Sequence, residues 1–472
     1  MILKHRDTEV LRFDWVEPFG VKNVEVNSAA ERFLPLAFRD RIGAGDTKAL
    51  TWAVEDWIMA RKPPARRKYI DKMLSYLGLN TGNPRDLLAV SKGLSLNDVY
   101  WLVPDDSPLK WGMCNLYDND FSSIVAEMAF TGSGRHQEAT GVRSPEFTTD
   151  GALPKCWRRM KGKIVLYKGK SDKTIWDVGR EDGFGVEPFS EYYAAQLAAA
   201  MKLDHVDYGL DLYKGEFCCT CPLFTSERYG FVAARDLPNR DQCFKDSRFA
   251  DMFFFDAVIF NTDRHWGNFG YLVDNDTNEI VGPSPIFDNG YSLFSQARYY
   301  PGDPMNEFDD LRKFLARKSP VLYSDWLQFP GGVTDEMIDR LRLLKGFRFK
   351  HDKSFSLPPV RMEMIQYFLQ DRISKIVNYG CKADRFIKIG SSDDTIKQDE
   401  ERVTSPEDLR SMIAAALKLF PTISRQQLAE RLDIGSATVA RHIKALQEAG
   451  ELKRVGSRKT GYWQVIEKGG EA

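Results

Sequence analysis

The hydrophobic residues of this chain follow two periodicities, which predict a mixture of helices and strands. Apolar positions at helical spacing lie in Thr47–Met59, Arg66–Leu77 and Phe189–Met201, and a nearly unbroken apolar run covers Phe249–Phe260. Short β-type runs predict strands at Thr8–Trp15, Gly162–Lys168, Val206–Tyr213, Phe217–Leu223 and Gly230–Ala234, and a hairpin at Phe269–Val273 and Ile280–Phe287. Clustered strands followed by helices favour an α+β fold.

Changes in composition predict five segments along the chain. Residues 1–115 form a mixed α/β region whose role the composition does not reveal. Residues 116–245 are expected to form a first lobe that contains the strands, and residues 246–388 a second, mostly helical lobe. Residues 389–404 are polar and acidic, as in a linker, and residues 405–466 form a separate C-terminal module.

Charge and composition are those of a water-soluble globular protein. The 472 residues are 43% hydrophobic, and 66 Lys and Arg balance 67 Asp and Glu to a net charge of −1. The N-terminus is charged, and Phe249–Phe260 is too short to span a bilayer, so we expect a cytoplasmic protein without membrane contact. Four of the cysteines, Cys218, Cys219, Cys221 and Cys243, fit zinc spacing poorly and are interpreted as buried thiols.

One loop and one turn carry the residues of a phosphoryl-transfer site. Asp263 and Asn268 lie five positions apart in NTDRHWGN, and Asp288 follows in IFDNG after a predicted strand. In kinases a base Asp and a metal-binding Asn have this spacing, and a second metal-binding Asp follows. Each residue alone is ordinary turn chemistry, but the combination predicts Asp263 as base, Asn268 and Asp288 as Mg²⁺ ligands, and His265 beside the nucleotide.

The upstream segment offers residues for the nucleotide phosphates. Lys168 ends a predicted strand, where it would contact the phosphates of ATP, and Glu191 opens the next helix, where it would pair with Lys168. Lys163 and Lys170 are competing candidates. The turn that contains Thr149 and Gly151 would lie over the phosphates, and Ser144, Thr148 and Thr149 are candidate phosphorylation positions.

The motifs NTDRHWGNFG and IFDNGYSL, at residues 261–270 and 286–293, resemble the paired motifs of HipA-like serine/threonine kinases. The similarity covers about residues 146–388, and SLNDVYWL resembles the N-terminal part of some members. The resemblance implies a bilobal protein-kinase-like fold with an N-terminal extension, ATP and Mg²⁺ as cofactors, and a protein substrate. Family members include toxins of toxin–antitoxin systems, some silenced by autophosphorylation in the loop over ATP, but that loop is less rich in glycine and serine here.

Residues 405–466 are typical of a winged helix-turn-helix. Ser424 and Ser436 are placed to cap two helices, and Glu451–Val455 and Tyr462–Ile466 predict strands on either side of a basic tip. Between Ser436 and Thr460 six Lys and Arg face two Glu, a local charge of +4. The expected DNA contacts are Ser436, Thr438, Arg441 and His442 on the last helix, and Arg454, Arg458 and Lys459 on the wing.

The sequence leaves several alternatives open. The acceptor could be a lipid or small molecule, because a similar DRHxxN pattern also occurs in phosphoinositide kinases. A transcription regulator that only senses nucleotide is a second alternative, and the winged helix could dock protein instead of DNA. A homodimer and a separate antitoxin partner are both compatible with the sequence.

Overall fold

A computed structural model describes most of the chain. The residues outside this description are 17–19, 43–46, 65, 80–83, 135–140, 172–184, 238–242, 244–245, 298–333, 381–409, 411–412, 415–416, 418–422, 433–434, 457–460 and 467–472. The predicted linker at 389–404 and the wing tip with Arg458 and Lys459 therefore lie outside the described residues. Among those described, no helix is both long and apolar enough to cross a bilayer.

The N-terminal region is built on an antiparallel sheet in the order β3-β2-β1-β4. Its strands are β1 (Ile2–His5), β2 (Thr8–Trp15), β3 (Val21–Val26) and β4 (Tyr100–Val103). Its helices are α1 (Leu36–Ile42), α2 (Thr47–Ala60), α3 (Ile70–Tyr76), α4 (Pro84–Ser91), α5 (Trp111–Cys114) and α6 (Ser123–Thr131). Apolar residues of α2 pack against the strands in one buried cluster, as the helical spacing of that segment predicts.

A second antiparallel sheet, in the order β5-β6-β8-β7, contributes residues of β5, β6 and β8 to the cleft described below. Its strands are β5 (Lys155–Met160), β6 (Lys163–Gly169), β7 (Gly209–Tyr213) and β8 (Glu216–Pro222). Helix α7 (Glu187–Ala200) packs against β6 and β8. Strand β5 was not predicted, because its polar residues hide the alternation of a half-buried strand.

The third part combines a small sheet with helices. Strands β9 (Tyr229–Ala233), β10 (Gly270–Asp274) and β11 (Glu279–Pro283) pair in the order β11-β10-β9, and the helices are α8 (Ala250–Ile259), α10 (Asp335–Arg342) and α11 (Pro359–Gly380). The sequence grouped β9 with the strands before it, but β9 pairs with β10 instead. Strand periodicity identifies a strand without identifying its hydrogen-bonded partner.

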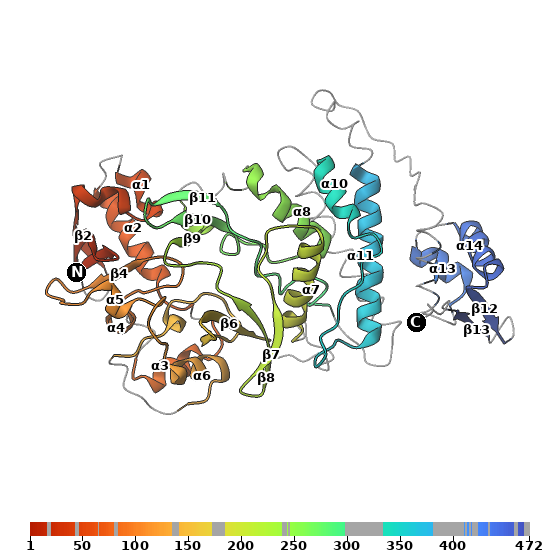
Figure 1. The fold of residues 1–472 in the computed structure, drawn as a ribbon, viewed down its shortest axis with the longest axis horizontal. Helices are drawn as coiled ribbons and strands as arrows, with labels where there is room; N and C mark the ends of the chain where they lie inside the picture. The colour runs from red at the N-terminus through yellow and green to blue at the C-terminus, as the bar shows by residue number, and fades with distance from the viewer. Residues whose placement is uncertain are drawn as a thin grey trace, which may run out of the picture.

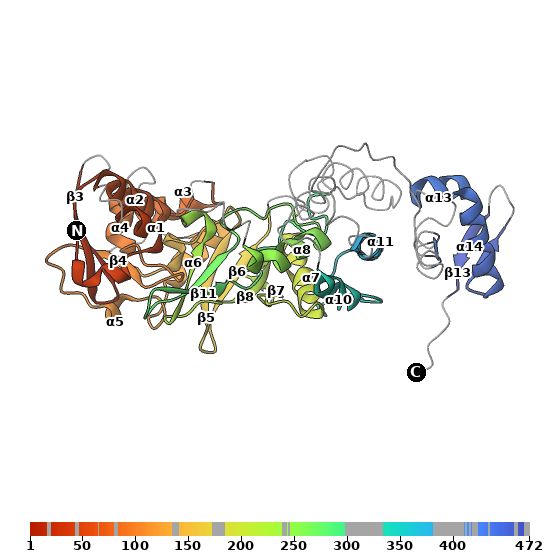
Figure 2. The ribbon, with the colours of Figure 1, turned by 90° about the horizontal axis from the view of Figure 1, so that it is seen from above.

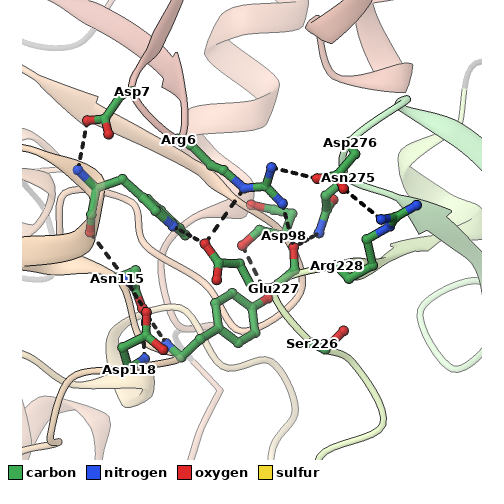
Figure 3. A network of polar contacts seen from close by, with 12 residues as sticks. Arg6, Asp7, Asp98, Asn115, Asp118, Ser226, Glu227, Arg228, Asn275 and Asp276 are labelled. Carbon is green, nitrogen blue, oxygen red and sulfur yellow. Dashed lines mark hydrogen bonds and ion pairs between the residues drawn. The ribbon is translucent and has the colours of Figure 1, made fainter.

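The N-terminal region is tied to the segment that connects β8 to β9. Figure 3 shows Arg6 between two acidic residues, with its Nη1 atom 2.6 Å from Asp276 Oδ1 and its Nη2 donating to Glu227 O at 3.0 Å. Trp111 Nε1 donates to the Glu227 carboxylate at 2.6 Å, and Asn275 Nδ2 donates to Glu227 O at 3.1 Å. In Figures 1 and 2 the red N-terminal elements lie beside the green β9–β11 sheet. The polar contacts therefore join the two parts directly.

The C-terminal module contains α13 (Arg425–Leu432), α14 (Ser436–Glu448) and the hairpin β12 (Leu452–Val455) and β13 (Tyr462–Val465). Its buried residues include Val439, Ile443 and Leu446 of α14 and Trp463 of the hairpin. Two helices and a hairpin lie where the sequence predicts them, although Gly435 rather than Ser436 is the residue before α14.

A buried ion pair fixes the loop that follows α8. The Nε and Nη2 atoms of Arg264 donate to the two carboxylate oxygens of Asp256 at 2.8 and 2.9 Å. Arg264 Nη1 donates to Asn268 O at 2.7 Å and to Phe287 O at 2.8 Å, and Nη2 also reaches Asn289 Oδ1 at 2.7 Å. The two charged side chains are only 5% and 6% exposed. One guanidinium therefore joins the end of α8, the loop at 261–268 and the turn at 287–289.

Replacing Arg264 with alanine is expected to lower the free energy of unfolding by about 3–5 kcal/mol, because it leaves the Asp256 carboxylate buried without its cation. Arg342→Ala is the matched control, since Arg342 pairs with Asp339 at 2.6 Å but both side chains are more than half exposed. That change should cost less than about 1 kcal/mol. Chemical denaturation of both variants measures the difference, and equal losses would contradict the structural importance of the buried pair.

Candidate active site

The structure brings the predicted kinase-site residues other than Glu191 into one cleft of about 1110 Å³. Asp263, Asn268 and Asp288 line it together with Lys168. They come from the loop after α8, the turn after β11, and the end of β6. Residues far apart in sequence thus face a common space, as phosphoryl transfer requires.

Local hydrogen bonds hold the loop at 261–268 in shape. Helix α8 ends at Ile259, and the left-handed backbone of the next residue, Phe260 (φ 56°), turns the chain out of the helix. Asn261 Nδ2 then donates to Asp256 Oδ1 at 2.8 Å, and its side-chain oxygen accepts from Asp263 N at 3.1 Å. Asn268 Nδ2 donates to Asp263 O at 3.0 Å, which closes the loop. These hydrogen bonds hold Asp263 and Asn268, two of the predicted functional residues, close to each other.

Lys168 lies between two carboxylates. Its ammonium forms ion pairs with Glu191 and with Asp288. The other carboxylate oxygen of Glu191 accepts from Asn289 N at 2.7 Å. The expected Lys168–Glu191 pair is thus present, whereas the competing Lys163 is exposed at the opposite end of β6.

Burial and charge act against each other at these groups. Burial would raise the pKa of Asp288, but Lys168 and Lys155 lower it well below the ordinary value, so this carboxylate stays ionised. Burial would likewise lower the pKa of Lys168, but Asp288 and Glu191 raise it far above the ordinary value. At Asp263 burial dominates and raises the pKa, while His265 and Lys168 oppose the shift. An aspartate with a raised pKa is better suited to accept a proton.

Two residues at the site were missed by the sequence reasoning. Lys155 begins β5, directly opposite Lys168 in the strand register, and it is 7% exposed. Burial lowers the pKa of Lys155, and the nearby Asp288 carboxylate opposes that shift. Tyr208 accepts a hydrogen bond from Asp288 N at 3.2 Å. Lys155 could have been found from the predicted phosphate loop that it ends, but Tyr208 carries no signal in the sequence.

The turn expected over the phosphates does border the cleft. Gly151 has a φ of +98°, and a Cβ atom there would lie 2.1 Å from Lys155 Nζ, so glycine is required. The hydroxyl of Thr149 donates to Pro145 O at 2.8 Å and accepts from Trp157 Nε1 at 2.9 Å. Thr149 thus shapes the turn through internal hydrogen bonds.

The remaining candidates near the cleft differ in exposure. Ser144 is buried and donates to the Glu146 carboxylate, and Thr148 Oγ1 donates to Leu94 O at 2.7 Å. The hydroxyls of these candidate phosphorylation positions are therefore engaged within the protein. His265 is exposed at the cleft, where its Nδ1 accepts from Gly267 N at 3.0 Å.

A metal ion in the cleft would be held by a small set of oxygen donors. Within the described ranges no group of three or more His, Cys, Asp or Glu could hold a metal ion. Asp288 and the amide oxygen of Asn268 are hard donors of the kind that Mg²⁺ prefers, and Mg²⁺ usually takes its other ligands from phosphates and water. The residues present therefore fit a cation that arrives with a nucleotide. The cysteines considered for zinc, Cys218, Cys219, Cys221 and Cys243, are buried and free.

The predicted DNA-contacting residues that the structure describes differ in their exposure. Ser436 and Arg441 are exposed and Thr438 partly so, while Arg454 stacks on the Trp463 ring at 4.7 Å. His442 is 5% exposed and lies on the same buried face of α14 as the core residues, so its assignment as a DNA contact is wrong.

Comparisons with known proteins agree with two parts of this description. The family model for "Winged helix-turn-helix DNA-binding" matches residues 416–450. A segment of the chain is 30% identical over 135 residues to the serine/threonine-protein kinase CtkA of Helicobacter pylori, which is 23% of this chain and 41% of CtkA. The match thus spans less than half of CtkA.

Two solved structures are also similar to the chain. The crystal structure of the proinflammatory kinase CtkA of Helicobacter pylori matches with a TM-score of 0.35 and 18% identity, over 50% of this chain and 95% of CtkA. HipA, from the complex of the Shewanella oneidensis toxin–antitoxin proteins HipA and HipB with operator DNA, matches with a TM-score of 0.41 and 11% identity, over 94% of this chain and 96% of the other. By the sequence matches, the chain is related over part of its length to a serine/threonine-protein kinase and carries a winged helix-turn-helix segment.

Proposed function

We propose that this protein is an ATP- and Mg²⁺-dependent kinase that transfers the γ-phosphate to a serine or threonine hydroxyl of a protein. The observation that carries the proposal is the shared cleft of Asp263, Asn268, Asp288 and Lys168. The partial match to a serine/threonine-protein kinase supports the same reaction class. A toxin role would follow if the phosphorylated protein were essential to the cell.

The residues of the cleft have different roles in the proposed reaction. Lys168 and Lys155 place two positive charges where the phosphates would lie, and in a cleft of low dielectric such charges stabilise developing negative charge. Glu191 keeps Lys168 in place through their ion pair. Asn268 and Asp288 would hold Mg²⁺, which supplies charge neutralisation on the phosphates when bound.

Asp263 would act on the acceptor. Its carboxylate orients the hydroxyl and takes its proton as the oxygen–phosphorus bond forms and the bond to the β-phosphate oxygen breaks. The raised pKa of Asp263, caused by burial, favours this proton transfer. A protein that only senses nucleotide has no need of such a base, which argues for the enzyme.

We further propose that the C-terminal module binds DNA. Its match to a winged helix-turn-helix model and the exposed Arg441 on α14 support this. The second helix of such a motif enters the major groove, and basic side chains contact the phosphates. A kinase joined to this module would be localised to DNA.

Asp263→Asn is expected to lower phosphorylation of cellular proteins by about 100-fold or more, because general-base catalysis is removed, while ATP binding persists. Mass spectrometry of cells that express either form, with incubation of purified protein and lipid pools in labelled ATP, identifies the acceptor class. Asp71→Asn, at an exposed position of α3 outside the residues that line the cleft, is the control and should keep activity. Full activity of Asp263→Asn would reject the base, and label in lipid alone would reject the protein substrate.

Arg441→Ala is expected to weaken binding to a random-sequence DNA duplex and to reduce the slope of log affinity against log salt by about one, because one phosphate contact is lost. Arg342→Ala removes an exposed arginine of α10 and should leave DNA binding unchanged. Fluorescence anisotropy at several salt concentrations measures both. Unchanged binding by Arg441→Ala, or no binding by the wild type, would contradict DNA recognition through α14.

A further inference from the structure

A buried arginine of the N-terminal region contacts the phosphate-side loop, defined here as residues 146–155. Arg67 is 3% exposed. Its Nη1 atom donates to Glu146 O at 2.8 Å and its Nη2 to Lys155 O at 2.7 Å, with a longer contact from Nη1 to Thr149 O at 3.4 Å. One guanidinium therefore joins the first and last residues of the loop.

The next residue holds the middle of the same loop. Lys68 N donates to Ala152 O at 2.9 Å, next to Gly151, whose left-handed backbone lies against Lys155. A loop that is held at its two ends and near its centre has far fewer conformations than a free one. Arg67 and Lys68, which lie between α2 and α3, thus hold the loop in one conformation.

The loop is also tied to the catalytic side of the cleft, but more weakly. Arg235 forms an ion pair with Asp150, and Arg235 N donates to Trp266 O at 2.9 Å. The Arg235 and Asp150 side chains are 39% and 41% exposed, so water screens this pair. The buried Arg67 contacts are the stronger restraint on the loop.

We propose that Arg67 is a positioning residue that fixes the phosphate-side loop, and with it the Lys155 side chain, against the phosphates of a nucleotide. This inference rests on the proposed kinase function. By this inference the N-terminal region supports the nucleotide site indirectly, because Arg67 binds the backbone of the loop.

Arginine is required for this role by its shape. Its planar fork presents donors in fixed directions, so Nη1 and Nη2 satisfy two different carbonyls at once. Lysine keeps the charge but concentrates its donors on one nitrogen at the end of a flexible chain. Arg67→Lys should therefore release one end of the loop while it preserves the net charge.

Arg159, in the strand β5 that Lys155 begins, provides a control. Its Nη2 donates to Leu116 O at 3.0 Å and also to Tyr117 O and Asn119 O, so it too joins β5 to the N-terminal region through backbone carbonyls. Lys155 begins β5, whereas Arg159 lies near the C-terminal end of the strand. Arg159→Lys thus disturbs a similar contact between the same two parts without touching the loop.

The test is isothermal titration of full-length wild type, Arg67→Lys and Arg159→Lys with ATP and Mg²⁺ and, separately, with adenosine. Arg67→Lys should bind ATP about tenfold more weakly, as expected for a lost hydrogen bond from a charged donor, and adenosine as the wild type does. Arg159→Lys should bind both ligands normally, and thermal unfolding shows that the variants are folded.

The outcomes separate this inference from the function on which it rests. Normal ATP affinity in Arg67→Lys, or equal weakening of ATP and adenosine, would overturn the positioning role while the kinase proposal stands. Equal loss of ATP affinity in both variants would also overturn it, because the effect would then belong to the contact between the two parts. If the wild type itself bound no ATP, the proposed function and the inference would both fail.

Discussion

The candidate site depends on the guanidinium of Arg264, whose side chain is 5% exposed. It balances the charge of Asp256 at the end of α8 and binds the backbone of both Asn268 and Phe287. Because those carbonyls belong to the two segments with the expected metal ligands, their separation is set by one rigid, planar group. Asp256 itself is held in place because its neighbours in α8 pack into the main buried cluster.

Side chains of opposite charge lie close together in the cleft. Lys168 and Asp288 stabilise each other in their ionised forms, whereas burial lowers the pKa of Lys155 and raises that of Glu191. Removing one of these charged side chains would leave a buried partner without its counter-charge. The same arrangement of buried charges suits the cleft to bind a charged ligand. The N-terminal region is part of this arrangement, since it borders the cleft and contacts both the phosphate-side loop and the segment between β8 and β9.

The sequence predicts this site well where chemistry and spacing coincide. Asp263, Asn268 and Asp288 could be named in advance because kinase chemistry fixes their types and intervals, and β2, α2 and α7 could be placed because their apolar periodicity is strong. The partner of β9, the role of Lys155 and the support from Tyr208 and Arg67 arise from contacts across long stretches of chain, which no local pattern records. His442 was included because it belongs to the early residues of the last helix, although its position lies on the buried face with Val439 and Leu446.

The central claim is that Asn268 and Asp288 together hold a divalent cation against a nucleotide. Electron paramagnetic resonance of Mn²⁺ with the full-length protein, with and without ADP, tests it directly. The account predicts bound Mn²⁺ that depends on ADP in the wild type and is lost in Asp288→Ala. Nucleotide-dependent Mn²⁺ binding of equal strength in Asp288→Ala would contradict it.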